Sequence, residues 1–278
     1  MLINRRTISR SVRQVGIGLH TGESVSVRIL PSDTKSGIRF MTMLGSEITC
    51  VIPALINNIR KEALRTSLGI DHHAINTIEH LMAAFSAHGI TDADVMVWGS
   101  EIPMLDGTAM LWMELIQHAG IIQLDQCIDP IIVKQHLEIF NGSAWCSISP
   151  CDRFLLDYEL GYDHPLLIAQ HASIELSLDS FLNDIAAART FGFRSDLESL
   201  HAVGLSKAAG IDNVLVFDDD GAMNRDGMRW ANEPARHKIM DAVGDLYLAG
   251  RPIIGHFRGH HSGHAMNHEL VRMLIGYD

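Results

Sequence analysis

The sequence is poor in three features that would assign it to a well-defined class: paired cysteines, long apolar runs and positive charge. Its four cysteines show no CxxC spacing and no paired pattern, which argues against a disulfide framework and against a cysteine-based zinc site. No run approaches the roughly 18 apolar residues that span a bilayer. Basic residues number 22 and acidic residues 33, and this net charge of −11 argues against a broad nucleic-acid-binding face.

Histidine, by contrast, is abundant. With 16 histidines in the chain, a borderline metal ion would be held by imidazole and carboxylate groups rather than by thiolates. A hydrophobic content of 47% with 20% charged residues is typical of a globular protein. The first residues carry charge but no apolar segment of the kind found in signal peptides, so we expect a cytoplasmic protein.

The first half of the chain shows strand and helix patterns in succession. Residues 24–30 alternate polar and apolar side chains, and this pattern and the apolar run at residues 94–98 predict strands. A helix is predicted from an N-cap at Thr77 to Gly89, and a second helix over residues 108–119.

The second half repeats this order. The predicted elements are strands at residues 131–140, 144–148 and 154–160 and a helix at residues 178–189. With 278 residues, the chain is long enough for two domains of about 130 residues. We therefore predict an α+β fold with two domains, residues 1–128 and 129–278, each a two-layer arrangement of a sheet covered by helices.

Residues 193–217 have the character of an insertion within the second half. A short helix pattern is followed by a strand pattern at residues 214–217, and together they suggest a βαβ-like unit that is apolar for a peripheral element. Two interpretations stay open: an ordinary piece of core, or the wall of an apolar groove.

The segment around His237 carries the most informative chemical pattern. It belongs to a helix pattern that ends before Gly250, and it places His237 and Asp241 four residues apart. On a helix, two such side chains share one face about 5–6 Å apart at Cβ and can bind one metal ion. Lys238 lies beside the first ligand, where it can offset negative charge on a substrate. The alternative is a surface His–Asp pair on an amphipathic helix.

Glu79 and His80 lie together at the start of the first predicted helix. Their order excludes the HExxH motif of metalloproteases, and the inverted HxxEH motif would need a histidine where Asn76 stands. Together with His237 and Asp241, His80 would complete a site of two imidazoles and one carboxylate with one open position, as in catalytic zinc sites. Glu79 would then deprotonate the attacking water. On its own, the Glu–His pair fits a solvated helix start.

A third cluster consists of His260, His264 and His268, whose i, i+4 spacing makes it an alternative metal site. A turn at Gly263 would leave only His264 and His268 on the helix that follows. We therefore prefer His264 as a general acid, because Asp245 of the preceding helix would raise its pKa and keep it protonated.

Six motifs, taken together, resemble one family. They are GIGLHTGE at residues 16–23, TIEHLMAA at 77–84, EIPMLDGTA at 101–109, RTFGF at 189–193, RHKIMDAVGDL at 236–246 and SGHAMN at 262–267. In this order, and over nearly the whole chain, they resemble UDP-3-O-acyl-N-acetylglucosamine deacetylase, the zinc amidase that commits Gram-negative bacteria to lipid A synthesis. The resemblance implies hydrolysis of the N-acetyl group of the UDP-sugar to give acetate and the free 2-amino sugar nucleotide.

The resemblance also implies a role for individual residues, with the active site between the two domains. The zinc ligands it implies are His80, His237 and Asp241. The catalytic residues it implies are Glu79 as general base, His264 as general acid, Asp245 as the residue that orients His264, and Thr190 as hydroxyl donor to the oxyanion. The substrate-binding residues it implies are Phe191, Tyr162 and Lys238. The insertion at residues 193–217 corresponds to the tunnel for the 3-O-acyl chain.

Three positions depart from the family pattern. His261 and Ala144 stand where the family commonly has lysines that help to hold the diphosphate, and Arg194 stands at a usually apolar position at the start of the insertion. We expect Arg194 to point to solvent, because Asp196 and Glu198 indicate a solvated helix face and an unpaired guanidinium is costly to bury.

Two alternative functions stay open. The missing lysines suggest a related zinc deacetylase that acts on a different N-acetyl sugar. The non-enzymatic alternative is a binding or regulatory protein that has kept the fold, and the complete catalytic set argues against it. For the enzyme we expect a monomer with zinc as cofactor, a UDP-sugar as partner, no nucleic-acid partner and no transmembrane segment.

Overall fold

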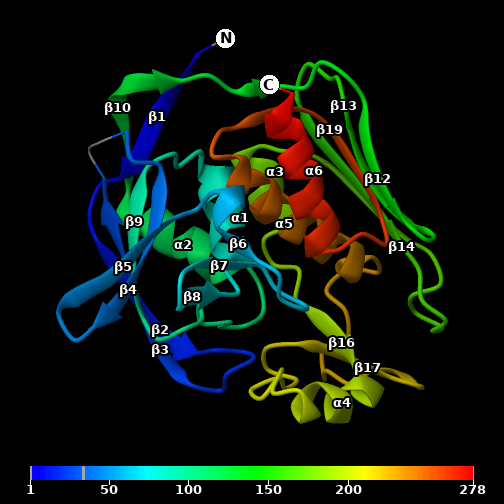
Figure 1. The fold of residues 1–278 in the computed structure, drawn as a ribbon. Helices are drawn as coiled ribbons and strands as arrows, with labels where there is room; N and C mark the ends of the chain where they lie inside the picture. The colour runs from blue at the N-terminus through cyan, green and yellow to red at the C-terminus, as the bar shows by residue number, and fades with distance from the viewer. Residues whose placement is uncertain (1, 33–34, 278) are drawn as a thin grey trace.

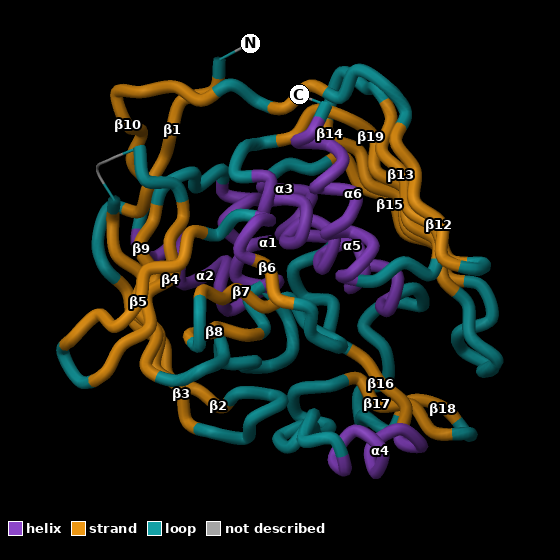
Figure 2. Tube along the Cα trace, in the orientation of Figure 1, coloured by secondary structure: helices purple, strands orange, loops and turns teal. Residues whose placement is uncertain are grey.

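The described part of the chain contains six α-helices and two large β-sheets, which confirms the predicted α+β class. The computed structural model describes residues 2–32 and 35–277. The helices are α1 (Glu79–His88), α2 (Met110–Ala119), α3 (Leu178–Asp184), α4 (Leu197–Ala202), α5 (Glu233–Leu246) and α6 (His264–Gly276). All except α4 lie between the two sheets (Figures 1 and 2). Within the described ranges, no helix combines the length and apolar character needed to cross a membrane.

The first large sheet takes its strands from the first half of the chain, in the order β2-β3-β9-β4-β5. Its strands are β2 (Val12–Ile17), β3 (Ser24–Pro31), β4 (Ile38–Leu44), β5 (Glu47–Pro53) and β9 (Ala93–Trp98). The strands predicted at residues 24–30 and 94–98 are confirmed as β3 and β9, and β9 buries every second side chain. The buried face joins the helices in one continuous apolar core.

The second large sheet takes its strands from the second half, in the order β12-β13-β19-β14-β15, with β11 beside β19. Its strands are β11 (Ile131–Ile132), β12 (Leu137–Asn141), β13 (Ala144–Ser149), β14 (Phe154–Leu160), β15 (Gln170–Glu175) and β19 (Ile253–His260). The single strand predicted over residues 131–140 is wrong, because β11 pairs with β19 whereas β12 pairs with β13. The helix predicted to residue 189 ends at Asp184, and the Ala186 carbonyl beyond it accepts from the Ala109 N–H instead.

Smaller sheets and turns connect these layers. They are the pair β1 (Ile3–Ile8) and β10 (Ile121–Ile128), the sheet of β6 (Ile59–Arg60), β7 (Ser67–Ile70) and β8 (His73–Asn76), and the 3₁₀ turns η1 (Ile56–Asn58) and η3 (Tyr247–Ala249). The predicted boundary near residue 128 falls between β10 and β11. The division into two domains stays a prediction.

The predicted insertion at residues 193–217 forms a small unit of its own at the edge of the molecule (Figure 1). Its elements are β16 (Phe191–Phe193), η2 (Arg194–Asp196), α4, β17 (Leu215–Asp218) and β18 (Gly221–Ala222). β16 and β17 pair in parallel on either side of α4, so the βαβ character expected from the sequence is confirmed.

The N-cap expected at Thr77 is wrong. Helix α1 begins at Glu79 with Ile78 as its cap, and no side chain caps it. Thr77 instead has a φ of +59° and donates its hydroxyl proton to Glu101 Oε1 at 2.9 Å. Glu101 is completely buried, so its carboxylate requires hydrogen-bond donors and takes the hydroxyl that would otherwise cap the helix.

The two halves of the chain meet closely where α1 lies against α5. A Cβ added at Gly244 of α5 would overlap the backbone carbonyl oxygen of Glu79 in α1. Glycine in the middle of a helix costs about 0.5–1 kcal/mol relative to alanine, so this glycine is explained by packing and not by helix propensity. The contact places the first turn of α1 directly against α5.

We expect Gly244→Ala to lower the free energy of unfolding by about 1–3 kcal/mol, since the new methyl group forces α1 and α5 apart. Urea unfolding followed by circular dichroism measures the change. The matched control is Gly276→Ala in α6, where an added Cβ has no described neighbour within 4 Å and stability should be unchanged or slightly higher. Equal behaviour of the two variants would contradict the role of the close helix contact.

Candidate metal centre

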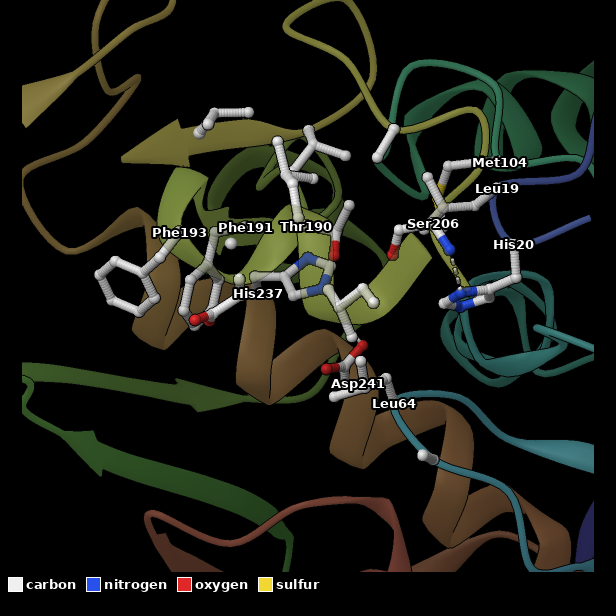
Figure 3. Close-up of a pocket in the computed structure, with 18 of the residues that line it drawn as sticks. Leu19, His20, Leu64, Met104, Thr190, Phe191, Phe193, Ser206, His237 and Asp241 are labelled. Carbon is white, nitrogen blue, oxygen red and sulfur yellow. Dashed lines mark hydrogen bonds and ion pairs between the residues drawn. The ribbon is translucent and has the colours of Figure 1, made fainter. Parts of the chain in front are cut away.

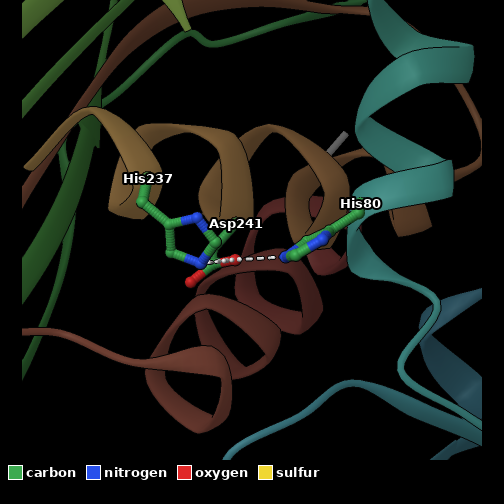
Figure 4. A group of neighbouring side chains, drawn as sticks. All are labelled: His80, His237 and Asp241. Atoms are coloured by element: carbon green, nitrogen blue, oxygen red, sulfur yellow. Dashed lines mark ion pairs between the residues drawn. The ribbon is translucent and has the colours of Figure 1, made fainter. Parts of the chain in front are cut away.

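Two imidazoles and one carboxylate converge between α1 and α5 (Figure 4). His237 and Asp241 lie one turn apart on α5, and His80 reaches them from α1. The Asp241 Oδ1 atom lies 3.4 Å from His237 Nε2 and 3.6 Å from His80 Nε2. All three side chains are buried, so the alternative of a surface His–Asp pair is excluded.

The spacing of these ligand atoms fits a tetrahedral zinc ion. Two atoms that each lie about 2.1 Å from such an ion are about 3.4 Å apart, which agrees with the separations found here. The three ligand atoms lie within 4.8 Å of one another. Among the described residues this is the one group of histidine, cysteine and acidic side chains that converges in this way.

The protonation states of His237 and Asp241 also suit a metal site. His237 Nδ1 lies 3.2 Å from the carbonyl oxygen of Ala188, which can only accept, so Nδ1 carries the proton and Nε2 keeps a free lone pair. Burial lowers the pKa of His237 to about 4 and keeps it neutral. Burial alone would raise the pKa of Asp241, but its interactions with the neighbouring His237 ring and with the charged Lys238 hold it well below its usual range.

Lys238 lies on the opposite side of the same carboxylate. Its Nζ donates to Asp241 Oδ2 at 2.8 Å, so the two oxygens of Asp241 face different partners. Burial would lower the pKa of Lys238, but the charge of Asp241 outweighs burial and raises the pKa above its ordinary value. Lys238 is therefore a fixed positive charge that lines the cavity described below.

Glu79 lies beside these residues, but the environment of its carboxylate differs from that of Asp241. Its side chain is buried, and its Oε2 accepts a hydrogen bond of 3.1 Å from the backbone N–H of Thr66. Burial raises the pKa of this carboxyl group above its ordinary value. A carboxylate whose pKa is raised is a stronger base, as a proton-accepting group requires.

His264 begins α6, and Gly263 is the cap that precedes it, as predicted. Its Nδ1 lies 2.8 Å from Asp245 Oδ2, and its Nε2 lies 4.0 Å from Asp241 Oδ2. Burial would lower the pKa of His264, but the charge and hydrogen bond of Asp245 raise it to about 9. The imidazole is therefore protonated at neutral pH and can donate a proton.

The alternative metal site among the C-terminal histidines is not formed. His260 ends β19, where its ring stacks on Trp145 at a centroid distance of 5.9 Å. His268 lies inside the protein, with Nε2 at 3.4 Å from Asp245 Oδ1. The ring nitrogen atoms of His260 and His268 therefore lie in different surroundings and do not converge on one point.

A cavity of about 780 Å³ opens beside these residues and extends into the insertion (Figure 3). One part of its wall consists of Glu79, His264 and the three converging side chains. The insertion supplies an apolar wall made of Phe193, Leu197, Leu200, Ile211, Val214 and Val216. Of the two interpretations of the insertion, the structure therefore favours the apolar groove.

The predicted oxyanion-binding and substrate-binding residues Thr190, Phe191 and Tyr162 also line this cavity. Thr190 is held by its backbone, with its N–H donating to Gly107 O at 2.8 Å and its carbonyl accepting from Leu215 N. The Phe191 ring stands at 86° to that of His237, with 6.3 Å between centroids. The ring centroids of Tyr162 and Phe191 are 6.0 Å apart, and Tyr162 is 37% exposed. All three expected positions are therefore at the cavity.

The three residues that depart from the family pattern lie in different surroundings. His261 accepts a hydrogen bond from the Gly161 N–H at 3.2 Å, and burial lowers its pKa, so it does not replace the charge of a lysine. Ala144 faces Asn141 across the hairpin of β12 and β13. Arg194 is exposed, as expected, although it also borders the cavity.

Two residues without a role predicted from the sequence, His20 and Thr66, also belong to this site. His20 lies at another part of the cavity wall (Figure 3), where its Nδ1 accepts from the Ser206 N–H at 3.2 Å. Burial lowers the pKa of His20 to about 4. The motif at residues 16–23 contains His20 and could have identified it as a site residue. No pattern in the sequence marks Thr66.

One comparison with known proteins bears on this site. Residues 5–276 match the family described as LpxC, UDP-3-O-acyl N-acetylglycosamine deacetylase. The match spans nearly the whole chain and includes every residue of the candidate site. The resemblance of the six motifs is thereby confirmed, and the chain belongs to the UDP-3-O-acyl N-acetylglycosamine deacetylase family.

Proposed function

We propose that this chain hydrolyses the N-acetyl group of UDP-3-O-acyl-N-acetylglucosamine at a zinc ion held by His80, His237 and Asp241. The family's activity is this deacetylation, a step of lipid A biosynthesis. The proposal for zinc and for the individual roles rests on one observation. The three ligand atoms converge next to Glu79, which is suited to accept a proton, and His264, which is suited to donate one.

The donor set favours zinc. Two imidazoles and one carboxylate suit a borderline divalent ion and would leave one coordination position for water or substrate. When bound, zinc would supply Lewis acidity, which polarises the acetamide carbonyl and lowers the pKa of water.

The protein's own residues then carry the protons. Glu79 accepts a proton from the water whose oxygen forms the new bond to the acetyl carbon. Thr190 donates its hydroxyl hydrogen bond to the oxygen that becomes negative. His264 donates a proton to the sugar nitrogen as the C–N bond breaks, and Asp245 keeps His264 oriented and protonated. Acetate and the 2-amino sugar nucleotide are the products.

The cavity supports the assignment of the substrate. Its apolar wall in the insertion suits the 3-O-acyl chain, because each buried CH₂ contributes about 0.8 kcal/mol. Phe191 and Tyr162 would contact the sugar, and Lys238 would provide positive charge for the phosphates. The division of the chain at residue 128, a monomeric state and a cytoplasmic location stay predictions.

The direct test is acetate release from the acylated UDP-sugar by the zinc-loaded protein and by Glu79→Gln. We expect the variant to retain zinc and substrate affinity while kcat falls about 10²–10⁴-fold, because the amide cannot accept the proton. The control is Glu114→Gln on the exposed face of α2, which should be as active as the wild type.

The same assay separates the alternatives. Comparable turnover of the non-acylated UDP-sugar would favour a deacetylase for a different N-acetyl sugar. Full activity of Glu79→Gln would contradict its role as the base, and absence of acetate release from every N-acetyl sugar by the zinc-loaded wild type would contradict the proposed function.

The pH profile tests His264. The acid must be protonated, so activity should fall as the pH rises through the pKa of His264, which the charge of Asp245 raises to about 9. We expect His264→Ala to lower kcat about 10²–10⁴-fold and to remove this alkaline limb. His260→Ala, which alters a neighbouring histidine stacked on Trp145, should keep both the rate and the limb. An alkaline limb that persists in His264→Ala would identify a different acid, with Lys238 or the bound water next in line.

A further inference from the structure

We propose that Thr66 is a positioning residue that orients the base Glu79 and the acid–carboxylate pair His264–Asp245 at the same time. The inference rests on the proposed function, because it assumes that these groups transfer the protons. Thr66 lies outside all six sequence motifs and does not line the cavity. Its influence on the reaction would therefore pass through the residues that it contacts.

The backbone of Thr66 is tied to the first turn of α1. Thr66 directly precedes β7 and is completely buried. Its carbonyl accepts from the Ile78 N–H at 3.2 Å, and its own N–H donates to Glu79 Oε2 at 3.1 Å. Because the second bond ends on the side chain of Glu79, it fixes the direction in which this carboxylate points.

The side chain of Thr66 is tied to a second carboxylate. Its Oγ1 lies 2.5 Å from Asp245 Oδ1, and since an ionised carboxylate only accepts, the hydroxyl must be the donor. The other oxygen of Asp245 accepts from His264 Nδ1 at 2.8 Å and from Asn267 Nδ2 at 2.9 Å. Thr66 and His264 therefore hold opposite oxygens of one carboxylate, and loss of the hydroxyl would leave Oδ1 without its shortest hydrogen bond.

The geometry of this network explains why a hydroxyl is needed. Asp245 is fully buried, so each of its oxygens needs a donor. Without Oγ1, the nearest described donor for Oδ1 is His268 Nε2 at 3.4 Å, which is a longer contact. The adjacent residue offers a contrast: Ser67 Oγ is also buried but has no hydrogen-bond partner among the described residues.

Thr66→Val removes the hydroxyl, keeps the shape of the side chain and leaves the backbone bond to Glu79 in place. We expect kcat for acetate release to fall about 10–100-fold, the usual effect of losing an outer partner of a catalytic group, while KM changes less than about threefold and zinc content stays the same. Thr66→Ser should restore most of the rate. Ser67→Ala, the matched control, should behave as the wild type. Thr66→Ala serves for the same comparison if the valine variant does not fold.

A double-mutant cycle tests whether Thr66 acts through Asp245. In an Asp245→Asn background, Thr66→Val should cause little additional loss of kcat, because the carboxylate that it orients is gone. A wild-type kcat in Thr66→Val, no rescue by serine, or a full multiplicative loss in the double variant would overturn the proposal. These results presuppose an active wild type, whereas a wild type without deacetylase activity would reject the proposed function itself.

Discussion

The contact between α1 and α5 at Gly244 is the constraint on which the site depends. Two of the three proposed ligands, His237 and Asp241, come from α5 and need only the spacing of one helical turn. The third proposed ligand and the proposed base come from α1 as consecutive residues, so the position of one helix sets both Glu79 and His80. Because a Cβ at Gly244 would overlap the Glu79 carbonyl, the approach of α1 depends on the absence of a side chain there.

The two buried carboxylates of the site, Asp245 and Glu79, have different neighbours and therefore different pKa values. Asp245 accepts from the Thr66 hydroxyl, from Asn267 and from His264, and the charge of His264 together with the neighbouring His268 holds its pKa below the ordinary value despite burial. Glu79 accepts from a backbone N–H, and burial raises its pKa. A low pKa suits a carboxylate that keeps an imidazole protonated, and a raised pKa suits one that must accept a proton.

Local patterns predicted much of this structure, and long-range contacts account for what they missed. The ligand spacing on α5, the start of α6 after Gly263 and the βαβ insertion all follow from short stretches of sequence, and the structure contains them. The N-cap expected at Thr77 was wrong because a buried carboxylate 24 residues away takes its hydroxyl. Thr66 could not be found from sequence, since its partner Asp245 lies 179 residues away.

Residues from both halves of the chain are proposed to bind one metal ion between α1 and α5. An anomalous difference map, measured at the zinc absorption edge on crystals of the zinc-loaded protein, would locate this ion. We expect one strong peak within about 2.0–2.2 Å of ligand atoms from His80, His237 and Asp241. A peak beside His260 or His268, or no peak between α1 and α5, would contradict it.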